Sequence, residues 1–132
     1  MITEILCTTD FSDSSNVALK WSINLARKLG AHLTILYTYR LFKQNGEAVM
    51  MKRIIEQEAA KNFGALENEL LSESGIEYDF KTEVGFVADR IGAHAKKKNI
   101  SFLVMAKTMS MANREVFDDL VAQLRVPLVI VP

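Results

Sequence analysis

Five short runs of apolar, largely β-branched residues alternate along this chain with longer stretches in which apolar residues recur every three or four positions. Runs of the first kind are typical of buried strands, and stretches of the second kind are typical of amphipathic helices. Strands that alternate with helices usually pair in parallel through right-handed crossovers. The pattern therefore predicts an α/β fold with an open, mostly parallel five-stranded sheet and helices on both faces.

The predicted elements follow one another without a linker, a repeat or a low-complexity segment, so we expect one domain over residues 1–132. The predicted strands are residues 2–8, 33–39, 76–84, 102–106 and 126–131. The third strand alternates most regularly, which is typical of a strand near the sheet edge. The helices are marked by the spaced apolar residues Val17, Trp21, Leu25 and Leu29, then Met51, Ile55, Ala59, Phe63, Leu66 and Leu70, then Val87, Ile91 and Ala95, and finally Val116, Leu120 and Leu124.

Polar residues and glycines mark several of the helix ends. The serine-rich segment 12–15 offers N-caps for the first helix, and Gly30 is the predicted terminator of that helix. Asn113 is the predicted cap of the last helix. The chain is therefore expected to turn between the first strand and the first helix, close to residues 9–12.

Composition argues against several classes of protein. The chain has 16 lysines and arginines and 16 aspartates and glutamates, and nucleic-acid binders normally carry a basic excess on one face. The one dense basic run, residues 96–98, is expected at the end of a helix, where cations complement the helix dipole. No segment approaches the roughly 20 apolar residues that span a bilayer. We therefore expect a cytoplasmic protein with neither a nucleic acid nor a membrane as partner.

The residues that most often carry catalysis are few and isolated. Cys7 is the only cysteine and lies in an apolar run, so it is expected to be a buried core residue. His32 and His94 have no carboxylate or cysteine at the spacing of metal ligands. The glycine motifs of nucleotide-binding loops and the nucleophile elbow of hydrolases are absent. We expect no catalytic residue, no metal and no cofactor, and hence no enzyme.

A small ligand, if one binds, should lie beyond the carboxyl ends of the strands, as in other open parallel sheets. Asp10 is the first candidate, because a carboxylate just after the first strand can accept hydrogen bonds from a ribose or a base. Aspartate also commonly caps a local turn, and the sequence leaves both interpretations open. The predicted ligand contacts are Thr9, Asp10, Thr38, Met105, Ala106, Lys107 and Arg114.

The segment 5–12, followed by Ala18-Leu19 and by the segment 26–31, resembles the opening of the universal stress proteins. Segments 84–88, 103–105 and 126–131 resemble later parts of the same family, so the resemblance covers the whole chain. It implies a Rossmann-like α/β fold and a stress-response or regulatory role.

The resemblance also implies a homodimer in which the last strands of two subunits meet. An apolar strand at a sheet edge readily pairs with another, although helices covering both faces would explain the same residues. The predicted interface consists of Val126, Leu128, Val129, Ile130 and Val131.

One departure from the family concerns ATP. Nucleotide-binding members carry the stretch Gly-x2-Gly-x9-Gly-Ser/Thr after the fourth strand, and the backbone of such a loop holds phosphates. Here the glycine positions hold Ala106, Met109 and Arg114, Glu115 follows, and the shortened loop contains no glycine. ATP is therefore not expected in this degenerate site, although Lys107 and Arg114 could attract an anion.

The leading hypothesis is a non-enzymatic regulator that acts through homodimerisation and protein partners. The alternative is an adenine-nucleotide-binding module or slow ATPase that uses Asp10 and the loop after the fourth strand; Asp10 and Met105 match nucleotide contacts of the family by position. A receiver-like signalling domain is disfavoured, because Gly85 follows the third strand where that class needs an aspartate.

Overall fold

The computed structural model of the chain describes residues 3–42, 46–112 and 114–132. The elements in chain order are β1 (Glu4–Thr9), α1 (Asp13–Leu29), β2 (His32–Tyr39), α2 (Gly46–Leu66), a π-helical turn (Glu67–Leu71), β3 (Glu77–Val84), α3 (Val87–Lys97), β4 (Ile100–Ala106), α4 (Lys107–Ala112), α5 (Arg114–Leu124) and β5 (Leu128–Val131). The five predicted strands are confirmed. Asn113, the predicted cap, lies outside the described residues, as does Ile2 at the start of the first predicted strand.

The sheet has the strand order β3-β2-β1-β4-β5, and every neighbouring pair is parallel. The prediction that the third strand lies near an edge is confirmed, and β5 forms the other edge. The chain moves outward from β1 to β3 and then crosses to β4 on the other side of β1. The carboxyl ends of β1 and β4 thus form the point of reversal at which open α/β sheets usually bind ligands.

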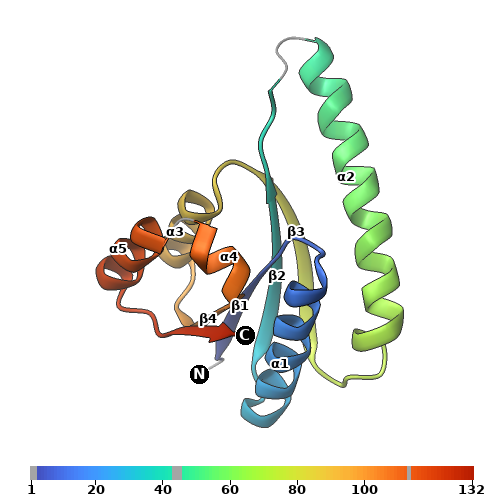
Figure 1. Cartoon of the computed structure of the whole chain (residues 1–132). Coiled ribbons are helices and arrows are strands. Elements are labelled where there is room, and N and C mark those ends of the chain that lie inside the picture. Colours follow the sequence, from blue (N-terminus) through green and yellow to red (C-terminus); the bar gives the residue numbers. More distant parts are fainter. Residues whose placement is uncertain (1–2, 43–45, 113) are drawn as a thin grey trace.

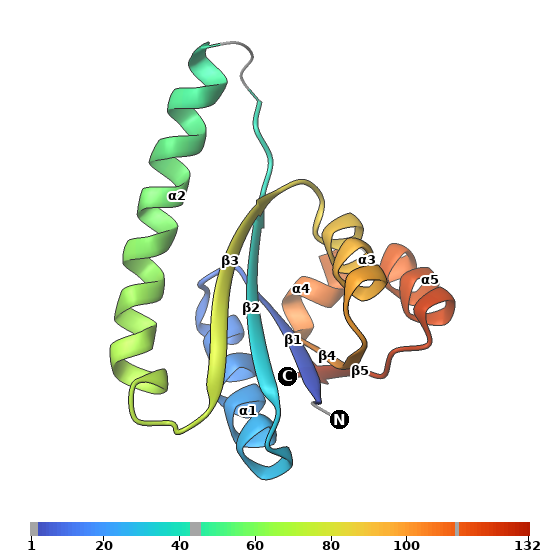
Figure 2. The ribbon, with the colours of Figure 1, turned by 180° about the vertical axis from the view of Figure 1, so that it is seen from behind.

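Helices cover both faces of this sheet, as the alternation predicts. Figures 1 and 2 show α1 and α2 on one face and α3 and α5 on the other. Alternate residues of the strands divide between two apolar clusters, one under α1 and α2 and one under α3 and α5. None of the described helices is both long and apolar enough to cross a membrane.

Helix α1 shows why apolar spacing alone does not identify the packing side of a helix. Its start and end agree with the predicted signals: Ser12 caps it by accepting a hydrogen bond from the backbone of Ser15 at 3.2 Å, and Gly30 ends it with φ of 63°. The side that packs on the sheet, however, consists of small and apolar residues, namely Ser15, Ala18, Leu19, Ser22, Ile23 and Ala26. Small side chains let the helix approach the strands closely. The stripe of larger residues that includes Trp21 lies on another side.

Helix α2 extends beyond the sheet. Its second half packs through Ala59, Phe63 and Leu66, whereas its first half projects past the strand ends (Figures 1 and 2). Val49, Met50 and Ile54 in the projecting half are more than half exposed, at 65%, 56% and 58%.

Candidate functional site

The segments that follow β1 and β4 meet at the point of reversal, as predicted, but their side chains divide into two groups. Thr9, Met105 and Ala106 are buried within the fold, at 2%, 0% and 0% exposure. Thr38 is half-buried, whereas Asp10, Lys107 and Arg114 are exposed. The predicted ligand contacts therefore do not form one continuous exposed surface.

Asp10 uses its carboxylate to hold the turn between β1 and α1. One oxygen, Oδ1, accepts hydrogen bonds from the Ser12 backbone at 3.0 Å and from the Ser15 hydroxyl at 2.5 Å. Phe11, in between, adopts a left-handed conformation with φ of 62°, and its backbone donates to the Thr9 hydroxyl at 3.0 Å. Of the two interpretations that the sequence left open, the capping one describes these contacts.

The same contacts set the pKa of Asp10. Partial burial raises the pKa of the carboxyl, but the hydrogen bonds from Ser12 and Ser15 together outweigh burial, so the pKa lies below its ordinary value. Asp10 is thus ionised at neutral pH, and its charge is already solvated by the turn.

The segment after β4 is a helix rather than the loop that the sequence suggested. Helix α4 begins at Lys107 directly after Ala106, and the Ser110 hydroxyl donates to the Lys107 carbonyl at 2.8 Å. The residues from 106 to 112 include no glycine or proline, and alanine, lysine and methionine are strong helix formers. The composition that removes the phosphate-binding loop therefore also allows the helix.

Met109 fills the space between the end of β1 and α4. Its thioether sulfur, Sδ, lies 3.8 Å from the Thr8 hydroxyl oxygen and 3.4 Å from the Ser15 hydroxyl oxygen. Thr8 and Ser15 are both completely buried. A flexible, polarisable side chain suits such a gap. The polar groups at the carboxyl end of β1 are consequently paired with one another and with Met109.

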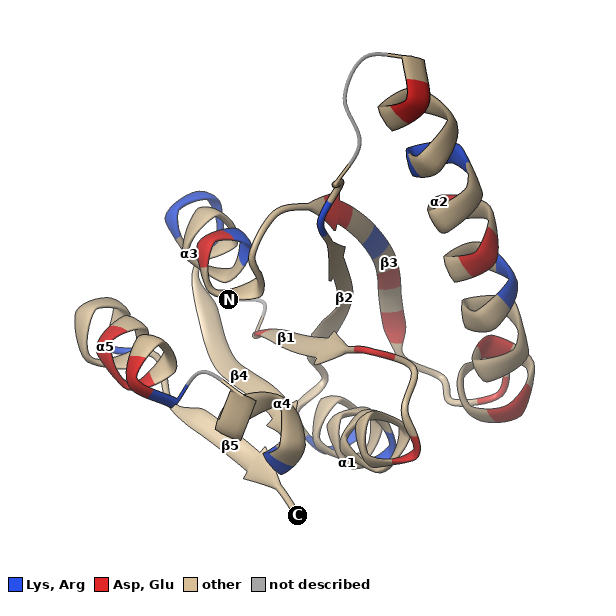
Figure 3. Ribbon diagram, turned by 45° about the horizontal axis from the view of Figure 1, so that its top comes forward, with Lys and Arg blue, Asp and Glu red and all other residues tan. Residues whose placement is uncertain are grey.

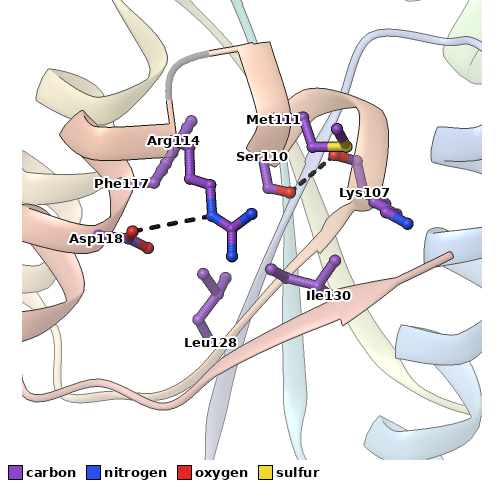
Figure 4. A pocket seen from close by; sticks show the side chains of 8 residues that line it. All are labelled: Lys107, Ser110, Met111, Arg114, Phe117, Asp118, Leu128 and Ile130. Atoms are coloured by element: carbon purple, nitrogen blue, oxygen red, sulfur yellow. Dashed lines mark hydrogen bonds and ion pairs between the residues drawn. The ribbon is translucent and has the colours of Figure 1, made fainter.

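A separate cavity of about 320 Å³ lies beside the edge strand, between α4, α5 and β5. Its apolar lining includes Met111, Phe117, Leu128 and Ile130, and Figure 4 shows Arg114 extending above Leu128. The Arg114 guanidinium lies 4.0 Å from the Asp118 carboxylate, four residues further along α5. The cavity combines an apolar floor with a charged rim.

Charged residues also lie on the sheet face beside α3, where they form ion pairs that the sequence did not predict. Imidazole nitrogens of His32 lie 2.7 Å from Glu4 and 3.2 Å from Asp79. Strand register brings both carboxylates to His32. Glu4 of β1 is aligned with His32, and Asp79 of β3 is aligned with Thr34, two residues after His32 on the same face of the sheet. The alternation of charged residues along β3, visible in Figure 3, is the sequence signal that could have indicated them.

A second ionic group lies further along β3. Glu83 accepts a hydrogen bond from Arg90 Nε at 2.9 Å, and His94 Nε2 lies 2.9 and 3.0 Å from its two oxygens. Burial raises the pKa of Glu83, but the bonds from Arg90 and His94 outweigh it, so the pKa is lowered overall. Within the described part of the chain, no group of three or more histidine, cysteine or acidic residues is arranged to hold a metal ion.

Cys7 has no feature of a nucleophile. The thiol is completely buried in the core under α1, as expected from the apolar run that contains it. Burial raises the pKa of the thiol to about 11, so it stays protonated at neutral pH.

The edge strand β5 exposes part of the predicted dimer interface. Ile130 is 46% exposed, while Val126, Leu128 and Val129 are half-buried. Val131 is only 7% exposed, so its side chain belongs to the core, and its backbone is the part that lies at the edge. Among the described residues β5 pairs with β4 alone, which leaves its outer backbone groups without a strand partner.

Comparisons with known proteins agree with this fold. The family model described as the Universal stress protein family matches residues 1–132. A crystal structure of a universal stress protein family member from Burkholderia pseudomallei is similar, with a TM-score of 0.77 and 20% identity over 98% of this chain and 96% of that one. No curated protein matches the sequence.

Two further solved structures contain nucleotides. A universal stress protein in complex with cAMP has a TM-score of 0.73 and 20% identity over 98% of this chain and 97% of that one. The universal stress protein from Archaeoglobus fulgidus in complex with dAMP has a TM-score of 0.70 and 15% identity, over 100% and 98% of the two chains.

Proposed function

This chain belongs to the universal stress protein family, and we propose that it acts in a stress response or in regulation through homodimerisation and protein partners, without binding ATP as glycine-loop members do. In this proposal the protein is a cytoplasmic regulator and not an enzyme, and it has neither a nucleic acid nor a membrane as partner. The observation that carries the proposal is the position of Met109 at the carboxyl end of β1, in contact with Thr8 and Ser15.

Two features of this region oppose nucleotide binding, the position of Met109 and the helix α4. The Met109 side chain occupies the space beside the first strand, next to Asp10, whose carboxylate is engaged by the turn. In addition, α4 replaces the flexible loop, and a helix of six residues cannot offer the close backbone approach that glycines provide. A triphosphate would need both features to change.

The edge strand supports the dimer part of the proposal. An unpaired apolar edge is costly to leave in water and invites pairing with another strand. Ile130 presents a large side chain at this edge, and the cavity beside it adds apolar surface from Leu128 and Phe117. A second copy that pairs with β5 would cover both.

The test combines the oligomeric state with ligand-dependent melting. Analytical ultracentrifugation should find a dimer, and Ile130→Asp should weaken it at least about a hundredfold, because the charge would be buried without a partner. Ile54→Asp changes an exposed apolar residue of α2, away from β5, and is the matched control that should leave the dimer intact. Millimolar Mg-ATP should not shift the melting temperature. A monomer at all concentrations, or a clear shift with ATP, would contradict the proposal.

A second candidate function is a small adenine-nucleotide module or slow ATPase. The similar structures with cAMP and dAMP carry one phosphate each, and a single phosphate needs a smaller anion site than ATP does. Lys107 and Arg114 are exposed cations near the carboxyl end of the sheet. Melting with AMP and cAMP tests this reading: a shift that Asp10→Ala abolishes favours it, whereas no shift favours the regulator.

A further inference from the structure

Helix α1 carries an apolar stripe that the fold leaves in water. Val17, Trp21 and Leu29 are 48%, 42% and 46% exposed, and they recur at spacings of four and eight residues along one side of the helix. Trp21 is the only tryptophan of the chain. Three large apolar side chains aligned on one helix form a continuous surface rather than scattered exposures.

The stripe faces the β5 edge of the sheet. On the opposite flank of α1, Arg27 Nε donates to the Ser74 carbonyl at 3.1 Å, which fixes that flank toward the end of α2. Helix α1 contacts β5 directly, and Leu25 belongs to the apolar cluster that includes Val129 and Val131 of β5. Figures 1 and 3 likewise show α1 between α2 and the C-terminal strand. The exposed stripe therefore adjoins the unpaired edge.

We propose that the α1 stripe (Val17, Trp21, Leu25 and Leu29) is the second layer of the interface with a second copy of this chain, covered by the partner's own α1 stripe. The inference rests on the proposed homodimer. Two β5 strands that pair antiparallel are related by a two-fold axis perpendicular to the sheet, and such an axis brings the same surface of both copies together. The two α1 helices then lie on the same side of the joined sheet.

Charge and size fit this arrangement. The two-fold axis makes the α1 helices antiparallel, so the first turn with Asp13 points toward the partner's last turn, where Lys28 lies on the same side of the helix as the stripe. The helix dipoles are also opposed, which is favourable. The partner's strand lies about 4.8 Å beyond β5, so the helices stay apart and a large side chain is needed to span the distance. Trp21, in the middle of the stripe, provides it.

The fluorescence of Trp21 tests the inference directly. On dilution through the dimer dissociation range, the emission should shift to longer wavelength and acrylamide quenching should rise, because the indole becomes exposed. Val17→Glu should raise the dissociation constant at least about tenfold. Lys61→Glu, at an exposed position of α2 away from the stripe, is the matched control and should leave it unchanged.

The outcomes separate this inference from the proposed function. A dimer whose Trp21 emission and quenching equal those of the monomer, or that Val17→Glu does not weaken, would overturn the role of the stripe and leave the β5 dimer standing. A protein that is monomeric at every concentration would overturn both. Dimer formation with coincident burial of Trp21 would support both.

Discussion

The carboxyl end of β1 and the edge formed by β5 and α1 differ in what they leave to solvent. At the end of β1, the Ser15 hydroxyl contacts both the Asp10 carboxylate and the Met109 sulfur, so these polar groups are paired within the chain. At the edge, Trp21 and Ile130 remain exposed, and the strand backbone has an open side. The comparison shows that polar groups at the carboxyl end of β1 are paired within the chain, whereas the edge exposes large apolar side chains and unpaired strand backbone.

The largest effect is expected at the cavity beside β5. Phe117 is 2% exposed and packs between α5 and the sheet, so Phe117→Ala should lower the free energy of unfolding by about 3 to 4 kcal/mol. Urea denaturation measures this loss. Met111→Ala changes an exposed residue of the same cavity and should stay within about 0.5 kcal/mol of the wild type. Equal losses of unfolding free energy in the two variants would contradict the assignment of Phe117 as a buried core residue and of Met111 as an exposed one.

Met109→Ala tests whether the closed region is closed by one side chain. Because Met109 is only partly buried, its truncation should lower the free energy of unfolding by about 1 to 2 kcal/mol, less than truncation of a fully buried side chain would. Mg-ATP should still leave the melting temperature of the variant unchanged, since α4 continues to replace a glycine loop. A shift in the variant but not in the wild type would show that Met109 alone blocks the site.

Asp10→Ala should lower the free energy of unfolding by about 1 kcal/mol, as expected when a carboxylate that accepts hydrogen bonds within a turn is lost. The melting temperature should fall slightly, while the dimer dissociation constant should stay the same, because Asp10 lies at the closed region and not at the edge. Asp13→Ala, an exposed acid on the first turn of α1, is the comparison for stability. A larger loss with Asp13→Ala than with Asp10→Ala would contradict the assigned role of the turn.

The smallest effect concerns pH. The pKa of Asp10 in the folded protein lies below its ordinary value of 3.8, so its ionised form stabilises the fold above about pH 4. This stability should disappear as the pH falls through the lowered pKa. Glu83, with an ordinary value of 4.5 and a lowered pKa, should act in the same direction. Unfolding curves between pH 5 and pH 2 should be flatter for Asp10→Asn than for the wild type, and parallel curves would contradict the contacts of Asp10.

Most of the fold was predictable from local patterns. The strands, the parallel pairing and the edge position of β3 follow from apolar runs, helical spacing and alternation, which are properties of neighbouring residues. The ends of α1 followed from Ser12 and Gly30 in the same way. Helix α4 was not predicted, because the missing glycines were considered only as a lost loop and not as a permitted helix.

The candidate site was less predictable, since its contacts join distant residues. The absence of a glycine loop was readable in the sequence, but Met109 and Ser15 are 94 positions apart, and their contact depends on how α4 leaves the sheet. The carboxylate partners of His32 and His94 likewise depend on strand register and on the packing of α3. Pair contacts of this kind have no local signature.

The sequence by itself determined an α/β sheet, its likeness to the universal stress proteins and the absence of glycine after the fourth strand, because each depends on residue type and local spacing. Only the tertiary structure decided which side of α1 meets the sheet. Both sides are apolar, and the one with the small residues Ala18, Ser22 and Ala26 packs, since it brings the helix closest to the strands. That choice leaves Trp21 in water beside the open edge, where the sequence pattern alone could not place it.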